Sequence, residues 1–141
     1  MITQQLFTLD KNNQGILFFD INDIIVIKDN FENNLFYFTN IEKIIPKKNN
    51  FLDVISPFDK KNFFLSPEMK NINNLPNKVT KYSSCYSLGI LTIYGFLKDK
   101  KKTINQNTFD KTIGFLGLNK LFYSLKRTIK DIPKERKLLY I

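Results

Sequence analysis

The stretch Cys85-Tyr-Ser-Leu-Gly-Ile-Leu-Thr-Ile-Tyr-Gly-Phe-Leu97 decides how this sequence folds. It is apolar almost all round, which predicts a helix that is buried on most of its faces. Ser83 or Ser84, directly before it, can cap the first turn. Its clearly apolar part, Leu88–Leu97, is too short to cross a bilayer. We therefore expect a buried helix of a folded domain and no membrane span.

The segments after this helix also have helical character. Lys98–Lys102 is a charged run that we expect to end the helix in water, and residues 103–114 form a polar connection with a helical turn. Phe115–Lys130 carries apolar residues at helical spacing, which predicts an amphipathic helix. Pro133 suits the first position of a last short helix, Pro133–Ile141, because its missing N–H costs nothing there.

The segments before the buried helix have strand patterns. Gly15–Phe19, Ile24–Ile27 and Leu35–Thr39 are short apolar runs bounded by polar residues. Residues 28–34 have a turn composition, so the second and third runs predict a hairpin. Residues 43–63 mix Lys, Asn, Asp and Pro with scattered apolar residues, which predicts a long surface loop. Strands followed by a run of helices indicate an α+β fold.

The composition excludes several classes of protein. The 141 residues suit one domain, and 43% hydrophobic with 25% charged residues is ordinary for a globular protein. The sequence has no His, which excludes an imidazole base, Ser-His and Cys-His nucleophile pairs and His-ligated metals. The single Cys85 excludes an intramolecular disulfide and a Cys-cluster metal site. Inside the apolar helix we expect it to be a buried, inert thiol.

The formal charge is +9, from 20 Lys and 2 Arg against 13 acidic residues. Such a charge balance can indicate binding to nucleic acid, but Arg, whose planar guanidinium binds phosphate better than the Lys ammonium does, is nearly absent. Lys, Asn and Ile supply 55 of the 141 residues and Ala is missing, which is typical of an AT-rich genome such as that of a large DNA virus, a parasite or an endosymbiont. The first residues lack the basic and apolar regions of a signal peptide. We expect an intracellular, cytoplasmic protein, in the host cytoplasm or the virion if it is viral.

Six segments in order along the chain resemble landmarks of the C-terminal lobe of a protein kinase. Gly15–Asp20 resembles the Gly-Ile-x-His-Arg-Asp approach to the catalytic loop, and Ile21–Ile27 resembles the rest of that loop and its following strand. Phe36–Glu42 resembles the strand ending in Asp-Phe-Gly, and Phe63–Glu68 resembles the Ala-Pro-Glu of the activation segment. Tyr86–Leu91 resembles the central Asp-x-Trp-Ser-x-Gly helix, and Ile132–Arg136 resembles the late Asp-Pro-x-x-Arg turn.

The resemblance covers nearly the whole chain and implies one kinase C-lobe-like domain, residues 1–141. Within it we expect a catalytic-loop and hairpin region at 15–42, an activation-segment-like loop at 43–68 and a helical core at 83–141. Residues upstream of Asp20 contain neither a Gly-rich phosphate loop nor a strand Lys followed by a helix Glu. We therefore expect the N-terminal lobe to be absent, which leaves a mainly helical domain with a small β-hairpin region.

The resemblance places Asp20 at the catalytic base, but its neighbours depart from the pattern. Phe18 and Phe19 stand where the family has His and Arg, and Asn22 stands where it has a Lys. Asp20 is therefore expected to be a vestigial base. Phe18 and Phe19 are expected to add apolar area to the surface that the N-terminal lobe normally covers.

The two metal-binding positions are also degenerate. The loop Asn of the family falls on Asp23 if a gap is allowed and on Ile25 if not, while Asn40 replaces the Asp of Asp-Phe-Gly. A neutral amide is a poorer ligand for magnesium than a carboxylate. We therefore expect neither a metal nor a cofactor, and no phosphoryl transfer by this chain alone.

The resemblance implies that the scaffold is better kept than the chemistry. Pro67 and Glu68 match the end of Ala-Pro-Glu, and Arg136 matches the Arg of the late turn. We expect Glu68 and Arg136 to form a buried or half-buried ion pair. Ser84 replaces the central-helix Asp that normally holds the catalytic loop, so we expect that anchor to be lost.

Three functions follow as hypotheses. The first is a catalytically inactive kinase-like domain that binds or regulates another protein through the surface that faces the N-terminal lobe in kinases. The second is a fragment of a split or truncated serine/threonine kinase, which would use ATP and magnesium and need an N-terminal lobe in trans. The third is a basic nucleic-acid-binding domain, which the charge alone supports weakly. No membrane partner is expected.

Overall fold

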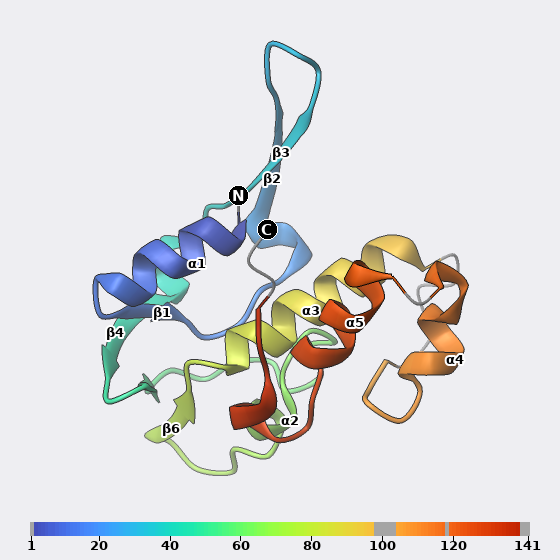
Figure 1. Ribbon diagram of the computed structural model, residues 1–141. Coiled ribbons are helices and arrows are strands. Elements are labelled where there is room, and N and C mark those ends of the chain that lie inside the picture. The colour runs from blue at the N-terminus through green and yellow to red at the C-terminus, as the bar shows by residue number, and fades with distance from the viewer. Residues whose placement is uncertain (1, 98–103, 118, 139–141) are drawn as a thin grey trace.

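The structure, a computed structural model, describes residues 2–97, 104–117 and 119–138. Over these residues the chain is α+β, as expected, with strands concentrated in the first half and helices in the second (Figure 1). The α-helices are α1 Ile2–Lys11, α2 Pro67–Lys70, α3 Ser83–Phe96, α4 Phe109–Ile113 and α5 Lys120–Thr128. The strands are β1 Gln14–Ile16, β2 Ile24–Lys28, β3 Asn34–Phe38, β4 Ile44–Lys48, β5 Phe51–Val54 and β6 Asn77–Thr80.

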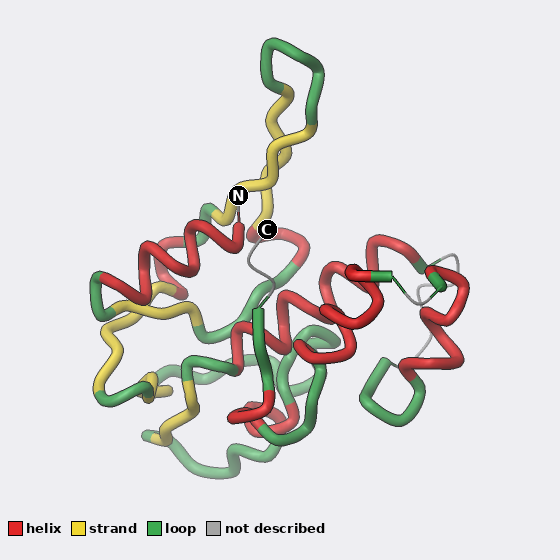
Figure 2. The backbone as a smooth tube through the Cα atoms, in the orientation of Figure 1, coloured by secondary structure: helices red, strands yellow, loops and turns green. Residues whose placement is uncertain are grey.

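Two antiparallel sheets form from these strands. The larger has the order β1-β4-β5-β6, and the smaller is the β2–β3 hairpin, in which Val26 lies opposite Phe36. The predicted hairpin is thus confirmed. It projects away from the rest of the protein as an isolated ribbon (Figure 2), and within the described residues neither of its strands pairs with a third strand.

The expected long loop at 43–63 is wrong over its first half, because residues 44–54 form β4 and β5. These strands turn at Asn49 and Asn50, which have φ of 50° and 66°, a left-handed conformation that Asn tolerates better than most residues. Leu52 and Val54 are buried on the inner face of β5. The polar composition that predicted a loop therefore belongs to the outer positions and the turn.

Helix α1 was not predicted from the sequence. Leu6 is its buried residue, and the helix packs against β1 and β3. Gln5 fixes this contact, since its side chain accepts from the Phe38 N–H at 3.0 Å and donates to the Phe38 carbonyl at 3.3 Å. Gln4, Thr8 and Lys11 are exposed, whereas Gln5 lies against β3.

Helix α3 confirms the predicted buried helix, but its start differs from the prediction. The N-cap residue is Tyr82, with no side-chain hydrogen bond to the first turn. The Ser83 hydroxyl instead pairs with that of Ser66 at 2.7 Å, and the Ser84 hydroxyl donates to the Lys81 carbonyl. These two hydrogen bonds connect the start of α3 to the residues before it.

The C-terminal helices are shorter than predicted. The expected helix at Phe115–Lys130 is divided, because Gly117 adopts a φ of 69° and Asn119 caps α5 by accepting from the Phe122 N–H. The expected helix from Pro133 is a single 3-10 turn, Pro133–Glu135, after which Arg136 is extended and held by its side chain. The Lys98–Lys102 run and residues 139–141 lie outside the described residues.

The central helix organises the core of the second half. Ile90 and Ile93 of α3 pack with Phe109, Phe122 and other buried residues of α4 and α5. Gly89 allows α5 to approach closely, since a Cβ there would lie 2.9 Å from Thr128 Cβ and closer still to its hydroxyl. No helix in the described part of the chain combines the length and apolar character that a membrane crossing requires.

Candidate functional site

Asp20 begins a 3-10 turn, Ile21–Asp23, and acts as its N-cap. Its Oδ1 accepts from the Asn22 backbone N–H at 3.1 Å, and its Oδ2 accepts from the Asn62 side-chain amide at 2.5 Å. Both carboxylate oxygens therefore carry a hydrogen bond. Asn62, which belongs to the segment before α2, was not identified from the sequence.

Asp23 and Asn40, the two degenerate metal positions, are brought together by the structure. The Asn40 side-chain amide donates to Asp23 Oδ1 at 2.8 Å, because the hairpin returns the chain to the 3-10 turn from which it started. Asp23 Oδ2 accepts from the Asp20 N–H at 2.9 Å. The Asp23 side chain is only 5% exposed, so this carboxylate is held inside the protein by donors on both oxygens.

A lysine completes this cluster. Lys43 Nζ lies 2.5 Å from Asp23 Oδ2 and 4.0 Å from the centre of the Phe18 ring. The 3-10 turn Ile41–Lys43 after Asn40 places the ammonium there. Lys43 was not identified from the sequence; its position three residues after Asn40 is the signal that could have found it. A buried carboxylate needs a compensating charge, and here this side chain supplies it.

The donor set does not fit a magnesium ion. Magnesium prefers oxygen ligands with octahedral geometry and usually binds at least one free carboxylate. Asp23 is already occupied by Lys43, Asn40 and a backbone N–H. Within the described ranges, no group of three or more His, Cys, Asp or Glu side chains is placed to hold a metal ion.

Phe18 and Phe19 do not form an exposed apolar surface, so that expectation is wrong. Phe19 is fully buried and packs edge-on against Phe38, with ring centroids 5.1 Å apart. Phe18 is half-buried and lies near Phe58 and Lys43. Phe19 is thus a core residue, whereas Phe18 packs at the edge of the core.

The expected loss of the loop's anchor to the central helix is also wrong. The Ser87 hydroxyl accepts from the Phe19 N–H at 2.6 Å and donates to the Phe19 carbonyl at 2.9 Å. Both residues are buried, so these two bonds hold the loop against α3. Ser84 takes no part, but Ser87, one helical turn further on, does.

Glu68 and Arg136 form the ion pair predicted from the sequence. Pro67 occupies the first position of α2 and Glu68 follows it. The guanidinium donates to both carboxylate oxygens, Nη1 to Oε1 at 2.5 Å and Nη2 to Oε2 at 2.8 Å. The Arg136 side chain is 0% exposed and that of Glu68 is 22% exposed, so the pair is buried at the guanidinium end and half-buried at the carboxylate.

Arg136 uses every N–H that it has. Besides Glu68, it donates to the backbone carbonyls of Lys130, Tyr82 and Asp131. A guanidinium carries five N–H groups, and these five bonds satisfy all of them. The guanidinium also lies 5.0 Å from the ring centre of Tyr86, whose pKa burial raises to about 12. One side chain thus connects α2, the start of α3 and the C-terminal turn.

Comparison with known proteins gives the fold. No protein-family model matches the sequence, and no curated protein matches it. Among solved structures, the crystal structure of a rhoptry kinase from Toxoplasma gondii matches with a TM-score of 0.65 and 16% sequence identity over 97% of this chain. The chain has a protein-kinase-like fold. It spans 40% of the length of the rhoptry kinase chain.

The kinase-like fold accounts for the order of the segments recognised in the sequence. The loop from Asp20, the hairpin, the Pro67-Glu68 segment, the buried α3 and the turn with Arg136 follow one another as the resemblance implies. At 16% identity the likeness concerns the fold, and what the site can do must be argued from its own residues.

Proposed function

We propose that this kinase-like chain is a catalytically inactive C-lobe-like domain that acts as a binding or regulatory module. The observation that supports this most strongly is the Lys43 ammonium on the Asp23 carboxylate. In kinases, magnesium ions neutralise charge at the corresponding place and position the nucleotide phosphates. In this chain a side chain fills that electrostatic role, so Asp23 has no charge left for a metal ion to balance.

The surroundings of Asp20 support the same proposal. The Asn62 amide donates to one Asp20 oxygen and the Asn22 N–H to the other, which fixes the orientation of the carboxylate. Each oxygen keeps a second lone pair. Asp20 therefore has a structural role, as the N-cap of the 3-10 turn and the partner of Asn62, that needs no substrate, nucleotide or metal.

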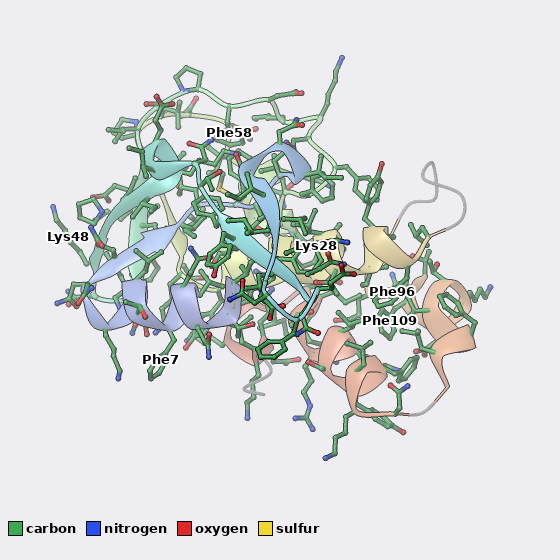
Figure 3. The ribbon with its side chains drawn as sticks, turned by 90° about the horizontal axis from the view of Figure 1, so that it is seen from above. Phe7, Lys28, Lys48, Phe58, Phe96 and Phe109 are labelled. Carbon is green, nitrogen blue, oxygen red and sulfur yellow. The ribbon has the colours of Figure 1, made fainter. Side chains whose placement is uncertain are left out.

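The surface that supports binding of another protein is the β2–β3 hairpin. It exposes Ile25, Val26, Ile27 and Phe36 from its strands, and Phe31 at its turn is 85% exposed. Viewed from above, the ribbon, with Lys28 on it, stands over the body of the protein (Figure 3). A contiguous exposed apolar surface is typical of a protein–protein contact. We propose that the partner lies here, on the side that the N-terminal lobe covers in kinases.

Thermal unfolding with and without magnesium and ATP tests the proposed inactivity. We expect the melting temperature to be the same in buffer, with MgCl2 alone and with MgCl2 and ATP. A rise that needs both ligands, and that disappears in Asp23→Asn, would contradict the proposal. It would favour the alternative, a split serine/threonine kinase with Asp20 as its base.

Site-specific photo-crosslinking tests the proposed partner surface separately. A photoreactive residue placed at Val26 on the hairpin is compared in cells with one placed at Asn49, an exposed turn position outside it. We expect a discrete crosslinked partner from Val26 and none from Asn49. Equal crosslinking patterns from both positions would argue against a binding role for the hairpin, whatever the outcome with nucleotide.

A further inference from the structure

Two adjoining hollows lie away from the Asp20 loop, on the side of the protein where α1, α5 and the C-terminal segment meet. The first, a cavity of about 340 Å³, is lined by α1, the start of α3, Lys134 and residues 136–138. The second is lined by α5, Lys137 and Leu138. The two hollows share Arg127, Lys137 and Leu138, and we call them together the basic groove. Figure 1 shows the red C-terminal segment crossing the first part of α3.

The lining of the basic groove is strongly cationic. Among the residues that the structure describes, Asp10 is the only acidic one that lines either hollow, and it is already paired with Lys47 and Lys81. Arg136, at the floor, is neutralised by Glu68. Four further cations line the groove without an ion pair to any described residue; they are Lys120, Arg127, Lys134 and Lys137. By contrast, Lys43, Lys47 and Lys126 all have acidic partners in the structure.

The same groove has an apolar side. Leu6 and Leu138 line it, and so does Phe7, which projects from α1 away from the strands (Figure 3). The Phe7 side chain is exposed. A ligand that matches this lining needs negative charges opposite the Lys and Arg side chains and apolar groups opposite Leu6, Phe7 and Leu138. A bare phosphate has no group that would use the apolar contacts.

A second copy of the chain does not fit this groove well. The chain carries a formal charge of +9, so two copies repel each other, and a cationic groove needs a partner of opposite charge. We propose that the basic groove binds an acidic peptide segment of another protein, one that alternates Asp or Glu with large apolar side chains. This inference does not depend on the inactivity proposed above or on the hairpin.

Fluorescence anisotropy with labelled peptides tests the proposal. The probe is a short peptide of Glu and Asp interspersed with Leu and Phe, and the comparison peptide has Lys in place of each acid. We expect saturable binding of the acidic peptide alone, weaker in higher salt because the contacts are charged. The Arg127→Glu/Lys137→Glu double variant should lose at least tenfold in affinity.

The matched control is Lys60→Glu/Lys61→Glu, which changes the net charge equally but lies outside the groove. It should retain affinity within about threefold, since distant exposed charges are largely screened. Phe7→Ser should weaken binding of the acidic peptide too. All variants are checked by circular dichroism, because the exposed positions should leave the fold unchanged.

Three results would overturn the proposal. An equal loss in the two double variants would mean that only net charge attracts the peptide. Absence of saturable binding would mean that the groove has no such ligand. Tighter binding of a single-stranded oligodeoxynucleotide than of the acidic peptide, lost in the groove variant, would assign the groove to nucleic acid instead.

Discussion

Removing the Arg136 guanidinium tests the central scaffold contact of this chain. The substitution Arg136→Met keeps much of the side-chain volume but deletes all five donors. It leaves the Glu68 carboxylate without its cation and removes the donors to the Tyr82, Lys130 and Asp131 carbonyls. Breaking a buried ion pair from one side costs about 3–5 kcal/mol. Because Glu68 is 22% exposed and can recover some hydration, we expect a value near the lower end, about 3 kcal/mol.

Urea unfolding followed by circular dichroism measures this change. With a slope of about 2 kcal/mol per molar urea, a loss of about 3 kcal/mol lowers the midpoint by roughly 1.5 M. Arg136→Lys keeps the charge but not the planar fork, so it should fall between the wild type and Arg136→Met. It also provides a measurable variant if Arg136→Met unfolds, since a typical domain has only about 5–15 kcal/mol in total.

The matched control is the exposed pair of Lys126 and Asp110, whose ammonium lies 2.8 Å from a carboxylate oxygen at the surface. Lys126→Met should cost no more than about 1 kcal/mol, because exposed ion pairs contribute little. If Arg136→Met and Arg136→Lys prove no more destabilising than Lys126→Met, the reasoning about this contact is refuted.

Three further predictions concern α3. Ser87→Ala should cost about 1–3 kcal/mol, because it leaves the buried Phe19 N–H and carbonyl without partners; faster amide hydrogen exchange at Phe19 would show it, and unchanged exchange would contradict the anchoring role. Gly89→Ala should destabilise the protein by about 1–3 kcal/mol, since the new Cβ would meet Thr128 and Ile129. Gly95→Ala in the same helix has open space around it and should stabilise the protein by up to about 1 kcal/mol. Chemical denaturation measures both changes, and equal effects would disprove the close α3–α5 contact. Burial raises the pKa of Cys85 to about 12, so the thiol stays protonated, and labelling by a disulfide reagent should remain slow from pH 7 to 10 in the folded protein and become fast in urea; rapid labelling of the folded chain at pH 8 would contradict this burial.

The parts of the fold that the sequence predicted are those with strong local patterns. The β-branched run at Ile24–Ile27, the polar turn after it and the apolar stretch at Cys85–Leu97 each specify one structure. The β4–β5 hairpin and α1 were missed because polar residues such as Lys47, Lys48 and Gln5 interrupt their apolar patterns. Their positions are fixed by contacts with β1 and β3, which lie elsewhere in the sequence.

The candidate site shows the same division. Glu68 and Arg136 could be paired in advance because the order of segments resembles a known family. The roles of Lys43, Asn62 and Ser87 could not be predicted, since each contacts a residue far away in the sequence. The largest such separation is 68 residues, between Ser87 and Phe19. A serine or lysine among many of its kind gives no sign of such a contact in the sequence itself.

The ammonium of Lys43 has a consequence for how this loop responds to its surroundings. A soluble cation can be withdrawn by a chelator or lost when its concentration falls, but a covalently attached one cannot leave. The segment from Asp20 to Lys43 should therefore keep one shape whether the medium is rich or poor in divalent ions.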